Sequence, residues 1–534
     1  MSPRVLIAGA GPTGLTLAID LARRGVTVRI VDQAEEFFAG SRGDGIQPRT
    51  LEIFEDLSVL DAVHAAGSPQ APMRVFLDGE FVTERRMSDL RESTPDVPYA
   101  NPWVLGQSDT EAILRSRLAE FGVEVELSTA LVTFTQDAEG VAAVLAGPGG
   151  PETMRADYLV GADGGRSTVR KTLAIAFEGS TDESIRMLLG DVPADALDHE
   201  FGYWFAAARE PGAGIALTPL PGRRLFQFAA PLAQDAEPTR AVLQDQFDRL
   251  SGRADVALGE PVWSTVWRPN IRLAQRFRDG RVFLAGDAAH AHPPTGGQGM
   301  NTGIADAYNL GWKLAAALAG TPEALDTYEP ERRAVAARVL GLSSDLLDKH
   351  VSGEPDALHR GEETHQLSVT YRAPGASGAL VAGDRAPDAP LRRSDGTSIR
   401  LFQLLAGPYF TLLHFQPATT STTPADGITG GTTAADGTAG AAAPADTTTR
   451  TTTPANGITV RTAPADTTVA ADDLPTTLTA GSTIREFSLT TPDTDPRDDQ
   501  LLAVDNLAFT AYDAVPGTRI LIRPDGYLAW RSDR

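Results

Sequence analysis

The sequence predicts an α/β protein of several domains, and three observations support this. Its 534 residues leave room for three or four domains. The apolar run Val5–Ala8, the glycine turn GAGPTG, the helically spaced segment Leu15–Arg24 and the β-branched run Val26–Val31 together read as a βαβ unit. Residues 180–267 alternate short apolar strands with Gly and Pro turns, which is typical of an antiparallel sheet.

Two later segments return to the pattern of the first unit. Tyr158–Val160 reads as a buried strand entering a second glycine turn, and Arg281–Ala285 as a strand followed by a Gly- and Pro-rich loop and long helices. We therefore predict a discontinuous first domain, residues 1–179 and 268–350, interrupted by the sheet domain of residues 180–267.

The last third of the chain has its own organisation. Residues 351–382 read as a helical linker and residues 383–534 as a final domain with strands near both ends. Within it, residues 417–480 hold 21 Thr and 15 Ala among 64 residues, with no aromatic side chain. Such a tract buries too little apolar surface to offset its ordering entropy, so we predict a disordered insertion there.

Composition excludes several classes of function. A net charge of −23 opposes binding to nucleic acid or to anionic membranes. The absence of cysteine excludes disulfides, thiol catalysis, iron–sulfur clusters and zinc–thiolate sites, and no metal site is expected. No apolar run is long enough to span a bilayer, and no signal peptide is evident, so we expect a cytoplasmic enzyme whose redox chemistry needs a cofactor.

The first glycine turn has the spacing of a dinucleotide site. Gly9 permits the tight turn, Gly11 lets a pyrophosphate approach the backbone, and Gly14 permits close packing of the helix on the strand. Asp32 ends the next strand, where it can accept a hydrogen bond from a ribose hydroxyl.

Two further motifs add to this signal. GADGGRSTVR spans Gly161–Arg170, and GDAAHAHPPTGGQGMN spans Gly286–Asn301. An acidic residue at a strand end can bind a ribitol or ribose hydroxyl, while a helix N-terminus offers backbone donors and a positive dipole to a reduced flavin.

In their order, the three motifs resemble those of the FAD-dependent aromatic hydroxylases, the p-hydroxybenzoate hydroxylase-like family, and within it the aromatic polyketide hydroxylases. The resemblance covers about residues 3–350 and implies a Rossmann-like FAD-binding domain of the GR2 type with an antiparallel substrate domain. The segments GDRAPD (383–388) and RILIRPDGYLAWR (519–531) are similar to the thioredoxin-like domain of many members. Without cysteine, such a domain could not exchange disulfides.

The resemblance also implies which residues hold the cofactor. The first glycines and Asp32 would bind the pyrophosphate and the adenosine ribose, Asp163 would lie near FAD and the transient NAD(P)H, and Asp287 would bind ribitol. Arg42 and Pro294 would lie near the flavin and substrate, although no side chain is a certain catalytic group. The complete implied set is Gly9, Gly11, Pro12, Thr13, Gly14, Asp32, Gln33, Arg42, Gln107, Leu131, Asp163, Asp287, Pro294, Gly299, Met300 and Asn301.

The implied activity is that of a monooxygenase with non-covalent FAD. NAD(P)H would reduce the flavin, O2 would add to give a C4a-hydroperoxyflavin, and this would hydroxylate a phenolic or polycyclic, polyketide-like aromatic compound, as in antibiotic biosynthesis. The protein would act as a monomer or homodimer. Two alternatives stay open, a Baeyer–Villiger reaction on the same fold and a non-catalytic ancillary flavoprotein of a biosynthetic pathway.

Other residues allow both functional and structural interpretations. His290 and His292 lack a carboxylate cluster at ligand spacing, which favours a structural role over a metal site. Arg166 and Arg170 could bind a cofactor phosphate or lie on an exposed helix face. The aromatic residues between Phe201 and Trp267 are expected to be mostly core, with about a third contacting ligand.

Overall fold

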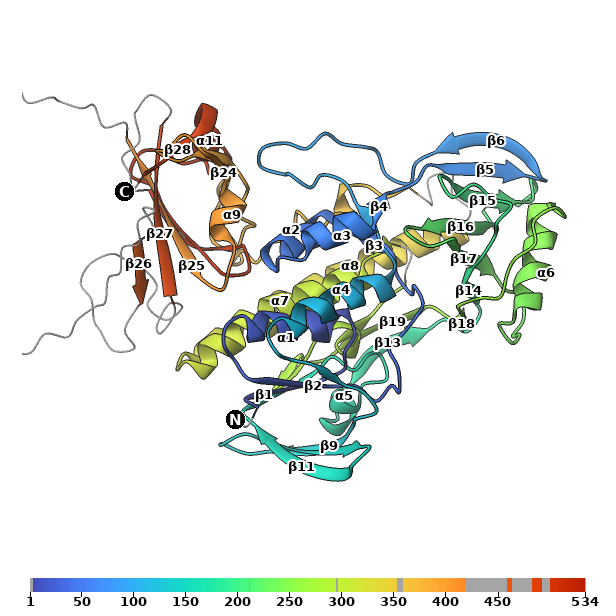
Figure 1. The fold of residues 1–534 in the computed structure, drawn as a ribbon, viewed down its shortest axis with the longest axis horizontal. Helices are drawn as coiled ribbons and strands as arrows, with labels where there is room; N and C mark the ends of the chain where they lie inside the picture. Colours follow the sequence, from blue (N-terminus) through green and yellow to red (C-terminus); the bar gives the residue numbers. More distant parts are fainter. Residues whose placement is uncertain are drawn as a thin grey trace, which may run out of the picture. The chain divides into compact units, whose positions relative to one another are not determined.

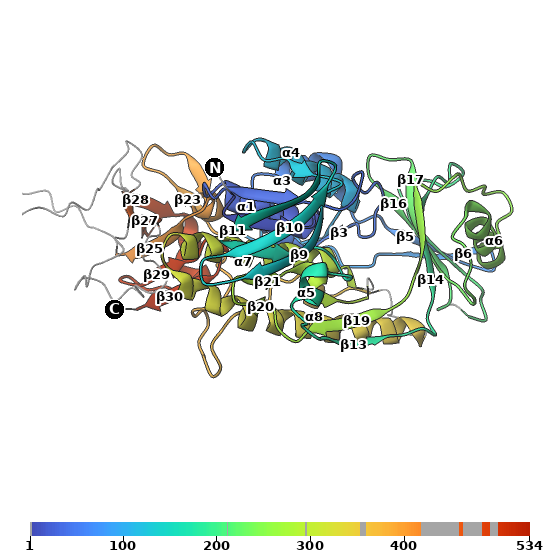
Figure 2. The same ribbon diagram turned by 90° about the horizontal axis from the view of Figure 1, so that it is seen from below.

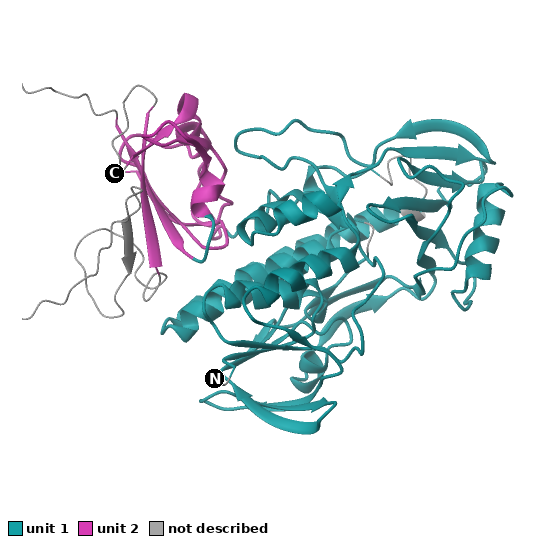
Figure 3. Ribbon diagram, viewed as in Figure 1, with its two compact units in different colours: residues 1–371, 406–408 teal, residues 372–405, 409–534 magenta. Residues whose placement is uncertain are grey.

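The computed structural model describes residues 3–210, 212–293, 296–352, 359–417, 459–462, 483–491 and 500–533. The chain forms two compact units, the first of residues 1–371 with 406–408 and the second of residues 372–405 with 409–534 (Figure 3). The predicted nucleotide-binding and sheet domains therefore lie in one unit. The boundary falls inside the segment that we predicted to be a linker, residues 351–382.

The first unit is built on a six-stranded sheet of order β20-β21-β12-β1-β2-β8. Its strands are β1 (Val5–Ala8), β2 (Val28–Val31), β8 (Val125–Glu126), β12 (Tyr158–Gly161), β20 (Arg278–Asp279) and β21 (Val282–Leu284). All neighbours are parallel except β20 and β21. Because the central strands are buried, they read as continuous apolar runs such as Val-Leu-Ile-Ala in β1.

Helices α1, α4, α7 and α8 lie side by side over this sheet (Figure 1). Their bounds and those of the shorter helices are α1 (Pro12–Ala22), α2 (Pro48–Asp56), α3 (Leu60–Ala66), α4 (Gln107–Ala119), α5 (Thr168–Thr172), α7 (Gly299–Leu318) and α8 (Tyr328–Val351). Two glycines let α7 approach α1, since a Cβ at Gly303 or Gly311 would overlap with Thr13 or Asp20. No helix of the described ranges is long and apolar enough to cross a membrane.

Three small sheets complete this part of the unit. They are β3 (Gly45–Ile46), β7 (Trp103–Val104) and β4 (Ser68–Pro69); β9 (Ala130–Gln136), β10 (Val141–Gly147) and β11 (Gly150–Ala156); and β13 (Phe177–Thr181), β19 (Asn270–Ala274) and β22 (His290–Ala291). The last of these sheets joins the Gly286–Asn301 motif to the strand that returns from the second large sheet.

The second large sheet has seven strands in the order β18-β14-β17-β16-β15-β5-β6. These are β5 (Met73–Leu77), β6 (Glu80–Arg85), β14 (Met187–Val192), β15 (Gly202–Ala206), β16 (Ile215–Leu220), β17 (Leu225–Pro231) and β18 (Trp263–Trp267). Residues 73–85 were not part of the predicted sheet; β5 joins through a parallel pairing with β15 that no local pattern reveals.

Aromatic side chains make the core of this sheet. Helix α6 (Arg240–Ser251) packs on one face, as Figure 2 shows, where Phe247 meets Phe205 edge to face. Phe205, Phe226 and Phe228 are fully buried, whereas Trp263 and Trp267 of β18 stay half-buried. The aromatic cluster is therefore mostly core.

The second unit contains one mixed sheet of order β24-β23-β28-β27-β25-β29-β30, with β26 paired to β27. Its elements are β23 (Pro390–Arg392), β24 (Ser398–Arg400), α9 (Leu401–Leu405), β25 (Phe410–Gln416), β26 (Thr459–Thr462), β27 (Thr483–Thr490), β28 (Gln500–Ala503), α11 (Leu507–Ala511), β29 (Arg519–Ile522) and β30 (Leu528–Ser532). Strand β26 lies inside the predicted disordered insertion, so these four residues correct that prediction. Most of the other residues of the insertion lie outside the described ranges.

Candidate functional site

The first glycine turn has the geometry that its spacing predicts. Gly9 has φ +103°, and a Cβ there would overlap with the carbonyl oxygen of Ala162. A Cβ at Gly14 would overlap with the carbonyl oxygen of Gly9, so only glycine lets α1 begin this close to β1. At Gly11, by contrast, no atom of the described residues, apart from its chain neighbours, lies within 4 Å of the Cβ position. This leaves open space for a phosphate against the backbone.

The N-terminus of α1 is free to bind an anion. Gly11 is the N-cap and Pro12 the first helical residue, and no side chain caps the helix. The first N–H groups of a helix lack intrahelical acceptors and carry the positive end of its dipole. Asp32 stabilises the turn, since the backbone N–H of Ala10 donates to its Oδ2 (2.8 Å) and that of Ala34 to its Oδ1 (2.9 Å).

The second motif supplies a buried acceptor. Oδ2 of Asp163 accepts the backbone N–H groups of Thr168 (2.7 Å) and Val169 (3.1 Å), while Oδ1 is buried and has no partner among the described residues. A buried carboxylate oxygen without a donor is unfavourable by about 1–3 kcal/mol or more, so a ligand hydroxyl here would be stabilising. Nearby, Arg170 donates to the carbonyl oxygens of Ala288 (2.9 Å) and Gly165 (2.8 Å). Arg170 therefore ties the second motif to the third, whereas Arg166 is exposed.

The acid of the third motif is open on one side and surrounded by protein on the others. Asp287 lies in the short 3-10 turn Gly286–Ala288, and its side chain is exposed. Burial nevertheless raises the pKa of its carboxyl, against the opposing effects of His290 and Arg42. A ligand covering Asp287 would complete its burial.

The end of the third motif begins α7. The side chain of Asn301 holds the loop before α2 in place: its Oδ1 accepts the Gln47 N–H (2.9 Å), and its Nδ2 donates to the carbonyl oxygens of Gly45 and Gly297 (both 2.8 Å). These bonds leave the backbone groups of Gly299–Asn301 as the donors that a flavin could use. Met300 is half-buried against the core, and Pro294 lies outside the described residues.

The remaining predicted residues fall into two groups. Gln107 begins α4 and donates to Glu111 (2.8 Å). Burial raises the pKa of Glu111; Arg42 acts to lower it and Asp32 to raise it. Arg42 thus lies near Asp287 of the third motif, and Glu111, which binds Gln107, lies near Asp32 of the first. Thr13, Leu131 and Gln33 differ: Thr13 packs against Gly286, Leu131 is a buried core residue of β9, and Gln33 is exposed.

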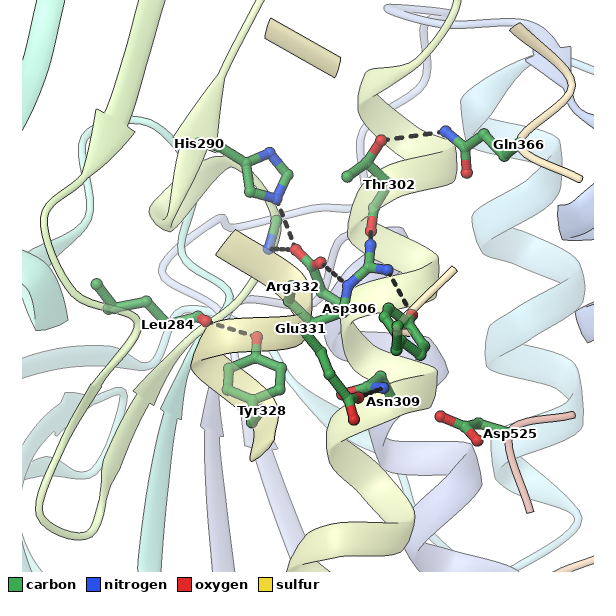
Figure 4. Close-up of polar contacts among 12 residues, drawn as sticks. Leu284, His290, Thr302, Asp306, Asn309, Tyr328, Glu331, Arg332, Gln366 and Asp525 are labelled. Atoms are coloured by element: carbon green, nitrogen blue, oxygen red, sulfur yellow. Dashed lines mark hydrogen bonds and ion pairs between the residues drawn. The ribbon is translucent and has the colours of Figure 1, made fainter. Parts of the chain in front are cut away.

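A buried network of ion pairs and hydrogen bonds contacts the third motif at Gly286 and His290 (Figure 4). Asp306 of α7 accepts the Gly286 N–H (3.0 Å), pairs with His290 Nε2 (2.6 Å) and accepts Nε–H of Arg332 from α8 (2.6 Å). All three side chains are buried. Burial raises the pKa of Asp306, but Arg332 and His290 lower it more, and the net pKa lies below its usual range.

The two histidines of the third motif stack on each other. His290 is fully buried on Asp306, and its ring stacks at 6.0 Å on that of His292. Burial, followed by His290, lowers the pKa of His292 to about 4, so its imidazole is neutral at physiological pH. The described ranges contain no cluster of three or more His, Cys, Asp or Glu that could hold a metal.

Sequence reasoning missed several residues of this site. Asp306 and Arg332 could have been noticed as charges within helical apolar patterns, but nothing local indicates that they meet. Ser41 and Asp191, which are hydrogen-bonded to each other, lie 150 residues apart in the chain. The uncapped helix, the open Gly11 and the unpartnered Asp163 oxygen nevertheless fit FAD.

Comparison with known proteins agrees with this geometry. Residues 3–343 match the FAD binding domain family. A flavin-dependent monooxygenase of Mycobacteroides abscessus is 45% identical over 427 residues, covering 77% of this chain and 88% of its own length. The 12-dehydrotetracycline 5-monooxygenase/anhydrotetracycline 6-monooxygenase of Streptomyces rimosus is 36% identical over 426 residues, covering 74% of this chain and 82% of its own.

Solved structures give the same result. Aklavinone-11 hydroxylase, in a ternary complex with FAD and aklavinone, matches with a TM-score of 0.75 and 25% identity, covering 100% of this chain and 96% of that one. Anhydrotetracycline hydroxylase from Streptomyces rimosus matches with a TM-score of 0.67 and 27% identity at the same coverage. The fold and site thus define a flavoprotein monooxygenase. The chain belongs to the FAD binding domain family of flavin-dependent monooxygenases, which use FAD, NAD(P)H and O2.

Replacing Asp287 tests its contact with the cofactor. In Asp287→Ala we expect FAD affinity to fall about tenfold to a hundredfold, because a charge-assisted hydrogen bond contributes about 1.5–3 kcal/mol. FAD retention after dialysis and fluorescence titration of the apoprotein measure this. Asp137→Ala, which removes an exposed acid paired with Arg155, is the control. Equal affinity in both variants would remove Asp287 from the site.

Replacing Asp306 tests the buried network. Asp306→Ala leaves Arg332 and His290 buried without their acceptor, and breaking such a pair costs about 3–5 kcal/mol. We expect the free energy of unfolding in urea to fall by this amount, while the exposed pair variant Asp137→Ala changes little. A fall no larger than that of the control would show that the network is dispensable.

Proposed function

We propose that this monooxygenase hydroxylates a phenolic, polycyclic aromatic compound of the polyketide type. The observation that carries the proposal is the convergence of the three motifs on one site beside a sheet rich in aromatic residues. The names of the relatives support it, since two of them are anhydrotetracycline monooxygenases and another, from Streptomyces venezuelae, is a rifampicin monooxygenase. A small aromatic substrate is the partner that we infer.

The proposed roles of the residues follow from their placement. The α1 N-terminus and Gly11 would hold the pyrophosphate, Asp32 the adenosine ribose, and Asp287 the ribitol chain. Bound FAD would supply the oxygen activation, which no amino-acid side chain can supply. The protein would bind and orient the ring and exclude water from it. Arg42, Gln107 and the α7 N-terminus would surround the isoalloxazine.

We also infer that the second unit is a thioredoxin-like domain. Its central strands β27 and β25 are parallel, and the hairpin β29–β30 extends the sheet in an antiparallel direction. This arrangement supports the inference made from the sequence of both ends of the domain. Since the chain has no cysteine, packing or association is its proposed use.

A turnover assay tests the proposed function. We expect the purified protein to release FAD on heat precipitation, and NAD(P)H oxidation to accelerate with an aromatic ligand from a panel of anhydrotetracycline, aklavinone, rifampicin and 2-naphthol. Mass spectrometry and NMR of the product should show one added ring hydroxyl. An oxygen inserted between ring carbons would instead indicate Baeyer–Villiger chemistry. Ligand binding without accelerated oxidation would indicate an ancillary flavoprotein.

A further inference from the structure

A row of three polar side chains runs along one face of α4. Gln107, Glu111 and Arg115 lie four residues apart, which places them one above the other on the helix. Nε2 of Gln107 donates to Oε1 of Glu111 (2.8 Å), and Nη1 of Arg115 lies 3.7 Å from Oε2 of the same carboxylate. The carboxylate of Glu111 is therefore held on both sides.

The row lies against residues 32–42, the segment that follows β2. Cζ of Arg115 lies 3.8 Å from the ring centroid of Phe37. At the other end of the row, a Cβ on Gly106, the N-cap of α4, would lie 3.4 Å from Cβ of Ser41. The row thus follows the segment that carries one residue predicted to bind the cofactor at each end.

The middle residue of the row is a buried acid. Glu111 is 4% exposed. Burial raises the pKa of its carboxyl, and the negative charge of Asp32 acts in the same direction. The hydrogen bond from Gln107 and the positive charges of Arg115 and Arg42 oppose this rise and favour the carboxylate. A carboxylate accepts hydrogen bonds and donates none.

The acceptor character of Glu111 determines which way the amide of Gln107 points. A side-chain amide has a donating nitrogen and an accepting oxygen, and only the nitrogen can bind a carboxylate. Gln107 is half-buried, and its Oε1 has no hydrogen-bond partner among the described residues. The atom of the amide that is left for a ligand is therefore the accepting oxygen.

We propose that Glu111 is a positioning residue of the dinucleotide site, which fixes the Gln107 amide so that Oε1 accepts a hydroxyl hydrogen of bound FAD. A phosphate only accepts hydrogen bonds and would be a poor partner for this oxygen, whereas the ribityl chain and the adenosine ribose of FAD both carry hydroxyl donors. The proposal rests on the placement of Gln107 beside the cofactor under the proposed function.

Exchanging the two residues tests the orientation of the amide. In Glu111→Gln the Gln107 amide can point either way, and in Gln107→Glu two carboxylates face each other. We expect each variant to bind FAD about three- to tenfold more weakly, as fluorescence titration of the apoprotein measures. The double variant Gln107→Glu/Glu111→Gln keeps the charge of the pair, restores its hydrogen bond with the donor on the other side and leaves an acceptor oxygen for the ligand. Its affinity should return close to that of the wild type.

Analogues of FAD that lack one hydroxyl test what the oxygen binds. One set lacks single ribityl hydroxyls, and the other lacks single hydroxyls of the adenosine ribose. We expect one analogue to bind the wild type about three- to tenfold more weakly than FAD does, and to bind Glu111→Gln no more weakly than the wild type. That analogue identifies the source of the hydroxyl. Equal weakening of FAD and of every analogue by Glu111→Gln would show a merely structural role and overturn the proposal.

A pair of the same kind elsewhere in the chain provides the matched control. On α6, Nε2 of Gln244 donates to Oδ1 of Asp248 (2.7 Å) at the same spacing of four residues. Asp248→Asn should therefore bind FAD as the wild type does. The same result for Glu111→Gln would overturn the role of Glu111. A double variant that binds FAD more weakly than both single variants would show that Gln107 donates to a phosphate, and would overturn its proposed orientation.

The outcomes separate this proposal from the proposed function. If Asp287→Ala loses FAD affinity while the variants of α4 keep it, the cofactor site stands and the role of Glu111 is overturned. If the variants of α4 and the FAD analogues behave as expected while no aromatic ligand accelerates NAD(P)H oxidation, the proposed function fails and the role of Glu111 stands.

Discussion

The arrangement of the site depends on one buried carboxylate. Asp306 accepts hydrogen bonds from the Gly286 backbone, His290 and Arg332, and thereby joins the third motif to α7 and α8. A charge this deeply buried is tolerated only because its partners and hydrogen bonds offset desolvation. Through the bond to Gly286 it holds the turn that carries Asp287 against α7. At the start of α7, Asn301 in turn binds Gly45 and Gln47, in the segment before α2.

The first motif depends on steric exclusion rather than charge. Gly9 and Gly14 leave no room for a Cβ, whereas Gly11 faces open space. The same residue type thus serves close packing at two positions and ligand access at one. Residue type alone does not separate the three glycines, but their spacing after the strand does, because the geometry of the βαβ turn is fixed.

Sequence patterns predicted the local parts of this protein well. The βαβ unit, the later parallel strands and the aromatic antiparallel sheet follow from periodicity, and the family assignment followed from three motifs in order. What could not be predicted are pairings between distant segments. Strand β5 joins the second sheet, and β26 of the Thr- and Ala-rich tract pairs with β27 beyond it. Asp306 of α7 binds Arg332 of α8. Each pairing depends on tertiary packing that no local window contains.

The same limit explains why, of residues 40–47 between β2 and α2, only Arg42 was predicted to belong to the site. The polar residues of this segment read as an ordinary surface connection until Ser41 is seen bound to Asp191, which lies 150 residues later in the chain. Both ends of the segment are held by hydrogen bonds, so little conformational freedom is left to lose when a ligand arrives. A side chain that must meet a substrate beside a cofactor is best placed on such a segment. Arg42 lies on this segment and acts on the carboxyls of Asp287 and Glu111, so its backbone position beside these two acids is restricted before any ligand binds.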